Sequence, residues 1–247
     1  MAVEWHSFPE GKAAAEACAE YIAEQIENAL TGRGYATLAL SGGATPKPMF
    51  ARLAAMKLPW DRIHFFWVDE RAVPPTDPQS NYSMAAETLL VPAHVPQQNI
   101  HRMRGELVAE AAARAYAQHI REFFGLDSGE TPKFDVVHRG MGPDAHTGSL
   151  FPGQPLIEDR QGLASGVYVQ KKSMWRITLL PGPLLAARST AVLVTGPDKA
   201  APLRSVFNEP YDPVCYPAQL GMREGRPMVW FLDHAAARLL EGAETAN

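Results

Sequence analysis

Residues 36–50 read ATLALSGGATPKPMF, and this stretch decides the fold. Its first part, Ala36–Leu40, is an apolar run of the kind found in buried strands. The glycine-bearing turn SGGAT follows, and Thr45 resembles a helix N-cap with Pro46 at the first helical position. A buried strand that leads through a tight turn into a helix is typical of a parallel sheet covered by helices.

The same alternation of short apolar runs and helical patterns continues in both directions along the chain. Apolar residues recur every four positions from Cys18 to Leu30, as in an amphipathic helix. Helical patterns also cover residues 81–90 and 106–124, and another begins after Asp233, a predicted N-cap. Further strands are expected at residues 63–68, 134–138, 176–180, 191–195 and 228–232. We therefore expect one Rossmann-like α/β domain over residues 1–247, with a mostly parallel sheet and helices on both faces.

Composition narrows the class of protein. The 247 residues are 46% hydrophobic and 20% charged, which excludes a disordered chain. The 23 Lys+Arg against 27 Asp+Glu give a formal charge of -4, with no basic field for nucleic acid or an anionic membrane. Cys18 and Cys215 form no CxxC pair, which argues against a disulfide scaffold and a zinc site.

Targeting signals are not evident either. The N-terminal residues MAVEWHSFPEGKAAA contain neither a basic n-region nor an apolar h-region, so we expect no secretory signal. No apolar run approaches the ~18 residues of a membrane span. With cysteine usage that suits a reducing compartment, these features predict a soluble, cytoplasmic protein.

Four of the predicted strands end in polar or glycine-rich segments. They are SGGAT at 41–45, Asp69-Glu70-Arg71, the stretch GMGPDAHTGS at 140–149, and GPDK at 196–199. In open α/β sheets, ligands bind in the crevice beyond the carboxyl ends of the strands. Because these segments are all expected at that edge, they predict a binding site there. Their clustering is stronger evidence for the site than any single motif.

Three of these segments suit an anion. Glycines at 42 and 43 let backbone N–H groups approach a phosphate or carboxylate, and Ser41 and Thr45 add hydroxyl donors. The segment is neither a Walker A loop nor a GxGxxG fingerprint, so it does not indicate a nucleotide. Arg71 can bind phosphate in a bidentate manner, and Lys199 can add a point charge. The alternatives are an ordinary tight turn and solvated surface charges.

His146 is the residue best suited to proton transfer. It lies just past a glycine turn, two residues after Asp144, and imidazole titrates near neutral pH. A hydrogen-bonded structural histidine is the alternative. The other histidines form no HxxxH or HEXXH pair, so we expect no metal. The chain has no GxSxG elbow, so we expect no covalent nucleophile.

Taken together, five segments resemble 6-phosphogluconolactonases, in that family's order. They are LALSGGATPKPMF, FFWVDERAVPPTDPQSNY, DVVHRGMGPDAHTGSLFPG, RITLLPGPLLAARSTAVLVTGPDKA and the late PAQL with WFLDHAA, and the resemblance runs from about residue 8 to 240. It implies an α/β fold shared with glucosamine-6-phosphate deaminase. It also implies hydrolysis of 6-phosphogluconolactone in the pentose phosphate pathway, without a cofactor.

In this interpretation the ligand is a small phosphosugar lactone, and the protein is a monomer or a small homo-oligomer. His146 is the general base that takes a proton from the attacking water. Asp144 orients His146 or contacts substrate hydroxyls, and Asp69 binds a hydroxyl or tunes His146. A backbone N–H of the turn at 140–142 stabilises the oxyanion. The phosphate is held by Ser41, Gly42, Gly43, Thr45, Arg71 and Lys199.

The chain departs from the family pattern at four positions. The family usually reads GMGxDGHTASLFP, whereas this chain has Ala145 for a glycine and Gly148 for an alanine. Ala145 would be strained at a positive φ, so we interpret the exchange as a sign that the position does not need one. His138 and Arg139 stand where paired aliphatic residues are usual, and they would alter the pocket rim or a partner contact. No assigned site residue is affected.

Two alternative functions remain open. One is a glucosamine-6-phosphate deaminase or isomerase-like enzyme, although the continuation GSLFPG favours the lactonase. The other is a non-catalytic sugar-phosphate-binding regulator. Such a protein usually carries a DNA-binding segment, and no basic helix-turn-helix pattern is visible here.

Overall fold

The apolar runs build a six-stranded sheet in which every neighbouring pair is parallel. This computed structural model describes residues 3–223, 225 and 227–240. The strand order is β1-β9-β8-β5-β2-β3. The strands are β1 (Glu4–Phe8), β2 (Ala36–Leu40), β3 (Ile63–Trp67), β5 (Val136–Arg139), β8 (Ser189–Val194) and β9 (Met228–Asp233).

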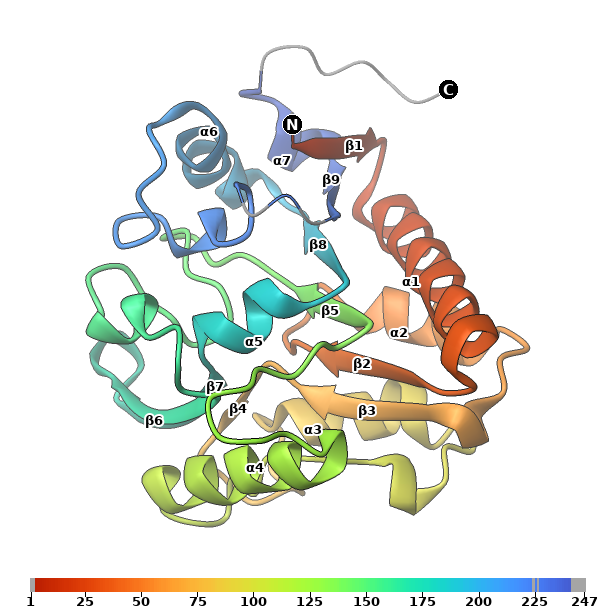
Figure 1. Ribbon diagram of the computed structural model, residues 1–247. Coiled ribbons are helices and arrows are strands. Elements are labelled where there is room, and N and C mark those ends of the chain that lie inside the picture. Colours follow the sequence, from red (N-terminus) through yellow and green to blue (C-terminus); the bar gives the residue numbers. More distant parts are fainter. Residues whose placement is uncertain (1–2, 224, 226, 241–247) are drawn as a thin grey trace.

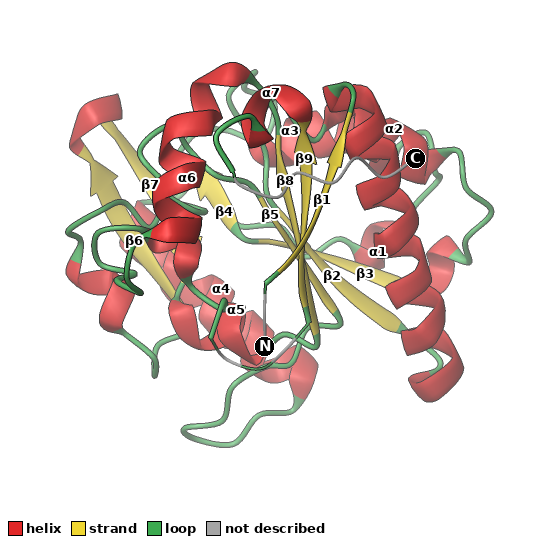
Figure 2. Ribbon diagram, turned by 90° about the horizontal axis from the view of Figure 1, so that it is seen from above, coloured by secondary structure: helices red, strands yellow, loops and turns green. Residues whose placement is uncertain are grey.

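Helices cover both faces of this sheet (Figures 1 and 2). On one face, α1 (Gly11–Arg33) packs with α2 (Lys47–Ala54), and on the other α6 (Ala200–Asn208) packs with α7 (His234–Ala237). Strand β9 shows why two layers form. Val229 and Phe231 join the core cluster that includes α1, whereas Trp230 and Leu232 join the cluster that includes α6 and α7. The predicted single-domain Rossmann-like α/β fold is confirmed.

A second, smaller sheet was not expected. It is antiparallel, with the order β4-β7-β6, and consists of β4 (Asp69–Arg71), β6 (Ala164–Val169) and β7 (Met174–Leu179). Helix α4 (Ala109–Phe124) packs against β6 and β7. The strand predicted at 176–180 therefore exists but lies in this sheet. Asp69–Arg71, predicted as the end of a parallel strand, forms a strand of its own.

The ends of several helices also test the sequence prediction. Asp233 caps α7 as predicted, because its side chain accepts the N–H of Ala236 at 2.8 Å. The start of α2 was wrong by one residue, since Pro46 is the N-cap and no side chain caps that helix. The helix predicted at 81–90 is α3 (Asn81–Ala85) with a π-helical continuation, and α5 is Pro181–Ala186. Within the described ranges, no helix has the length and hydropathy to cross a bilayer.

Candidate active site

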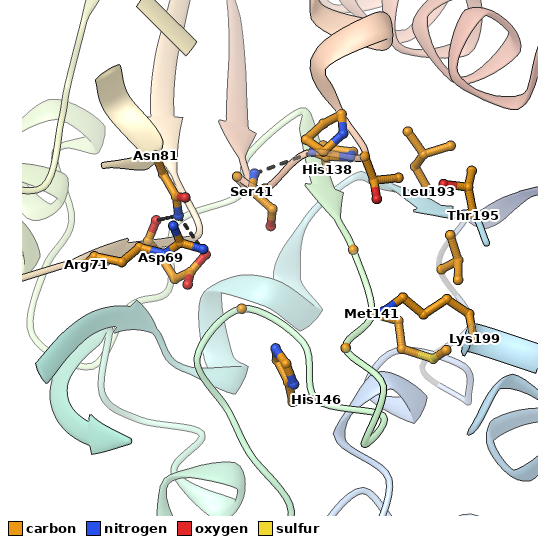
Figure 3. A pocket seen from close by; sticks show the side chains of 18 of the residues that line it. Ser41, Asp69, Arg71, Asn81, His138, Met141, His146, Leu193, Thr195 and Lys199 are labelled. Atoms are coloured by element: carbon orange, nitrogen blue, oxygen red, sulfur yellow. Dashed lines mark hydrogen bonds between the residues drawn. The ribbon is translucent and has the colours of Figure 1, made fainter. Parts of the chain in front are cut away.

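A cavity of about 200 Å³ opens at the carboxyl ends of the central parallel strands (Figure 3). It brings together segments that are far apart in the sequence. Every candidate site residue predicted from the sequence lines it except Asp144, which lies behind His146. Those that line it are Ser41, Gly42, Gly43, Thr45, Asp69, Arg71, His146 and Lys199.

The turn after β2 has the geometry of an anion cradle. Gly43 has a φ of 105°, and a Cβ at Gly42 would lie 1.8 Å from the side-chain oxygen of Asn81. Glycine at 42 is thus needed for the close packing of Asn81, and glycine at 43 for the left-handed backbone of the turn. Ser41 Oγ is buried and has no hydrogen-bond partner in the described part of the chain. An unpartnered buried hydroxyl is costly, so a ligand that accepts its proton would be favoured.

Three cations face this turn. Arg71 and Arg176 are direct cross-strand partners in the β4–β7 ladder, and both line the cavity. Like charges placed opposite each other repel, so an anionic ligand between them would be stabilised. Lys199 lies across the cavity, where its Nζ is 2.8 Å from Asp198 Oδ2 (Figure 3). Burial lowers the pKa of Arg176, and the charge of Arg71 lowers it further, against the opposing effect of Asp69.

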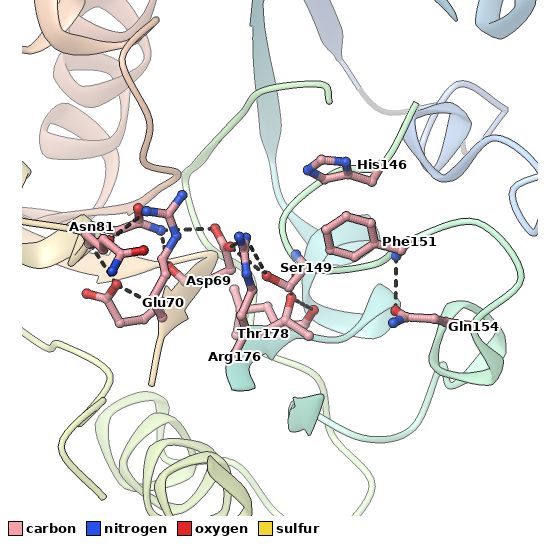
Figure 4. A network of polar contacts seen from close by, with 12 residues as sticks. Asp69, Glu70, Asn81, His146, Ser149, Phe151, Gln154, Arg176 and Thr178 are labelled. Carbon is pink, nitrogen blue, oxygen red and sulfur yellow. Dashed lines mark hydrogen bonds and ion pairs between the residues drawn. The ribbon is translucent and has the colours of Figure 1, made fainter. Parts of the chain in front are cut away.

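Asp69 is the centre of a buried polar network (Figure 4). Its Oδ2 accepts the Ser149 hydroxyl at 2.7 Å and lies 3.7 Å from Arg176 Nη1. Its Oδ1 accepts the Asn81 side-chain N–H at 3.3 Å. The carboxylate is therefore fixed in place, and its charge raises the pKa of His146.

Glu70, next to Asp69, supports the site without lining it. Its carboxylate accepts the backbone N–H groups of Arg71, Asn81 and Tyr82 and the hydroxyl of Ser80, all between 2.7 and 2.9 Å. Burial raises the pKa of Glu70, although these four bonds act in the opposite direction. Glu70 thereby fixes both Arg71 and Asn81 at the edge of the cavity.

His146 and Asp144 form a short imidazole–carboxylate pair at this cavity. The distance from His146 Nδ1 to Asp144 Oδ1 is 2.5 Å, and Lys171 Nζ lies 2.9 Å from Asp144 Oδ2. Burial favours the neutral acid, but the bonds from His146 and Lys171 hold the pKa of Asp144 at about 2. An ionised Asp144 can only accept, so Nδ1 carries the proton and Nε2 is left as the basic nitrogen.

The environment of His146 keeps it neutral. Burial lowers the pKa of His146 below its ordinary value, while Asp144 raises it. The ring stacks on Phe151 with a centroid distance of 4.1 Å. The ring is thus unprotonated at pH 7 and held in a defined orientation, as a general base would need to be.

The turn before His146 corrects one expectation. Ala145 has a φ of 62°, so the prediction that this position avoids a positive φ is wrong. The left-handed conformation costs a residue with a Cβ roughly 1–2 kcal/mol, which a folded protein can tolerate at one position. Hydrogen bonds of the turn stabilise it, from Ala145 N–H to Gly142 O at 3.1 Å and from Gly142 N–H to His146 O at 2.9 Å.

Two of the other departures, His138 and Arg139, lie inside the protein. His138 is 1% exposed and lines the cavity, and its Nδ1 accepts the Ser41 N–H at 3.4 Å. Burial lowers the pKa of His138 to about 3, so the ring is neutral. Arg139 is also 1% exposed and bonds to backbone carbonyls, so a partner contact through it is excluded.

Sequence reasoning missed four residues of the site: Asn81, Ser149, Lys171 and Arg176. Three of them belong to motifs that carry the family resemblance, namely Asn81 in SNY, Ser149 in GSLFPG and Arg176 in RITLLPGP. Lys171 belongs to none of those motifs, because it reaches Asp144 from the turn between β6 and β7. Among the described residues, His, Cys, Asp and Glu side chains form no group of three that could hold a metal ion.

Comparisons with known proteins identify the family and agree with the fold. The profile of a family described as glucosamine-6-phosphate isomerases/6-phosphogluconolactonase matches residues 9–230. A 6-phosphogluconolactonase of Nostoc sp. is 39% identical over 88% of this chain and 90% of its own length. The structure of 6-phosphogluconolactonase from Trypanosoma brucei matches 96% of this chain and 98% of its own with a TM-score of 0.87 at 27% identity. A monomeric glucosamine-6-phosphate deaminase shares the fold, with a TM-score of 0.82 at 18% identity over 96% of this chain and all (100%) of its own.

Proposed function

Since the chain belongs to the glucosamine-6-phosphate isomerase/6-phosphogluconolactonase family, we propose that it hydrolyses 6-phosphogluconolactone to 6-phosphogluconate without a metal or cofactor. Relatives named 6-phosphogluconolactonase at 34–39% identity support the substrate. The observation that carries the proposal is the neutral His146, held by Asp144 at the wall of a cavity lined by three cations.

The reaction proceeds by general base catalysis. Nε2 of His146 removes a proton from water as the water oxygen forms a bond to the lactone carbonyl carbon, and the carbonyl electron pair moves onto its oxygen. When the intermediate collapses, the bond between that carbon and the ring oxygen breaks. The proton on Nε2 then passes to the departing ring oxygen, which leaves a hydroxyl, a carboxylic acid and a neutral imidazole. Asp144 stabilises the transient imidazolium.

The oxyanion requires a donor in the turn at 140–142. Gly142 is unsuitable because its N–H already bonds to His146 O. The N–H groups of Gly140 and Met141, which both line the cavity, are the remaining candidates in this turn.

The substrate phosphate binds the turn after β2 together with the cations. Ser41, Gly42, Gly43 and Thr45 offer hydroxyl and backbone donors. Arg71 and Lys199 supply charge, and Arg176 joins them, which the sequence did not indicate. Asp69 acts on His146 through its charge and holds Arg176 in place.

Arg71→Ala is expected to act mainly through binding. A phosphate far from the carbonyl is held equally in the ground and transition states, so KM should rise while kcat changes little. A charge-assisted contact of about 1.5–3 kcal/mol corresponds to a rise of roughly 10- to 150-fold. Steady-state kinetics measure it, with Arg114→Ala on the exposed side of α4 as the matched control. An unchanged KM would place Arg71 outside the phosphate site.

Asp144→Asn is expected to shift the pH profile. The neutral imidazole is the active form, so kcat/KM falls as the pH drops through the pKa of His146. Burial places that pKa below its ordinary value of 6.5, and Asp144 raises it, so removing the carboxylate lowers it further. The acid limb of log kcat/KM should move to lower pH, while kcat at pH 7 falls at least ~10-fold because the tautomer is no longer fixed. A limb that stays in place or moves to higher pH would contradict the assigned pairing.

Substrate assays separate the two alternative functions. The lactone is generated in situ from glucose 6-phosphate, and its loss is compared with spontaneous hydrolysis. Release of ammonia from glucosamine 6-phosphate without lactone turnover would indicate the deaminase. Thermal stabilisation by 6-phosphogluconate without turnover of either compound would indicate a binding protein.

A further inference from the structure

Arg139 is a buried cation that the proposed reaction does not use. It ends β5, is 1% exposed, and does not line the cavity. No ion pair joins it to a carboxylate anywhere in the described part of the chain. A charge buried without a countercharge is unfavourable, so its presence needs an explanation.

Hydrogen bonds connect Arg139 to the turn that precedes His146. Its Nη2 donates to the carbonyl oxygens of Leu220 at 2.8 Å and Ala218 at 3.3 Å. Ala218 lies in the short 3₁₀ turn Pro217–Gln219, and its own N–H donates to the carbonyl of Ala145 at 2.9 Å. Arg139 is therefore joined to Ala145 through a single residue.

Ala145 is the position that most needs such support. It is in the left-handed region, 2% exposed, and directly precedes His146. A glycine would adopt this conformation without strain, whereas alanine has a competing preference for negative φ. A rotation of this backbone would move the imidazole away from Asp144 and the cavity.

We propose that Arg139 is a positioning residue that compensates for Ala145: through the turn Pro217–Gln219 it holds Ala145 in its left-handed conformation, and His146 with it. The proposal rests on the proposed function, because it is measured on lactone hydrolysis. Arg139 and Ala145 are two departures from the usual family pattern, and on this account they belong together.

Arg139→Met removes the charge and also leaves the carbonyl oxygens of Ala218 and Leu220 without this donor, which costs stability. A lower Tm is therefore expected whatever the role of Arg139, and kcat is measured well below the Tm of each variant. What separates positioning of Ala145 from a general structural role is the comparison of Arg139→Met with and without Ala145→Gly.

A double-mutant cycle tests the coupling. Arg139→Met is expected to lower kcat about 10-fold with Ala145 present, with KM within about twofold, and to lower it by less than about threefold when Ala145→Gly is also present. Glycine needs no support at that φ, so the effect of losing Arg139 should largely vanish. If Arg139 acted on His146 through its charge alone, Arg139→Met would lower kcat by the same factor with and without Ala145→Gly.

Each result has one meaning. An inactive parent enzyme contradicts the proposed function. An active parent with an undiminished kcat in Arg139→Met, or an equal loss in both backgrounds, overturns the positioning role. If Arg139→Met does not fold, Arg139→Lys in the same cycle gives the test, since lysine keeps the charge but loses the two-carbonyl geometry.

Discussion

His146→Asn is expected to lower kcat for lactone hydrolysis by about 10²- to 10⁴-fold, the usual contribution of a general base. Asparagine is nearly isosteric with part of the ring, but its amide cannot accept a proton from water at neutral pH. KM should change little because the cations proposed to hold the phosphate lie on other elements. Rates are measured with the spontaneous hydrolysis subtracted.

His94→Asn is the matched control for that experiment. His94 is exposed and has a φ of 54°, a conformation that asparagine tolerates well. Its replacement should leave kcat and KM at the parent values. If His146→Asn keeps more than about a tenth of the parent kcat, the histidine is structural, and Asp144 or Asp69 becomes the candidate base.

Gly142→Ala is expected to have the second-largest effect, about 10²-fold on kcat, without removing any functional group. A Cβ at this position would lie 1.9 Å from Cε1 and 2.0 Å from Nδ1 of His146, so the imidazole must move. A misplacement of about 1 Å in a catalytic group can reduce the rate about 100-fold. The loss should appear in kcat and not in KM, because the residues proposed to bind the phosphate are unchanged.

Gly140→Ala makes the same change two residues away. A Cβ there would meet nothing closer than the Leu193 carbonyl oxygen at 3.8 Å, so the imidazole should stay in place. We expect this variant to keep kcat within about threefold of the parent. Equal losses in the two variants would show that the turn, and not the position of His146, is sensitive to the substitution.

The fold could be predicted because its signal is local. Apolar runs alternate with helical patterns, and the ends of β2, β3, β5, β8 and β9 lie within about two residues of the runs predicted at 36–40, 63–68, 134–138, 191–195 and 228–232. Strands β1 and β6 were missed because EWHSF and ASGVYV mix polar residues and glycine with apolar ones. Which sheet β7 joins depends on its pairing with β4, which no local pattern encodes.

The same limit applies to the site. Arg71 ends β4 and His146 lies in the loop that follows β5, so both could be chosen from the sequence as candidates. Arg176 lines the cavity because the β4–β7 register places it opposite Arg71, which the sequence does not show. The prediction about the backbone of Ala145 failed for a different reason. Residue type alone was taken to exclude a positive φ, but a penalty of about 1–2 kcal/mol is small enough to be offset by the surrounding hydrogen bonds.

The most direct test of the central claim is the net rate at which the purified protein removes 6-phosphogluconolactone. The lactone is produced in situ by oxidation of glucose 6-phosphate, and its disappearance is followed at pH 7 with and without the protein. We expect a rate that rises in proportion to the protein concentration, far above spontaneous hydrolysis, and that is nearly abolished in His146→Asn. A rate equal to the spontaneous one at every protein concentration would contradict it.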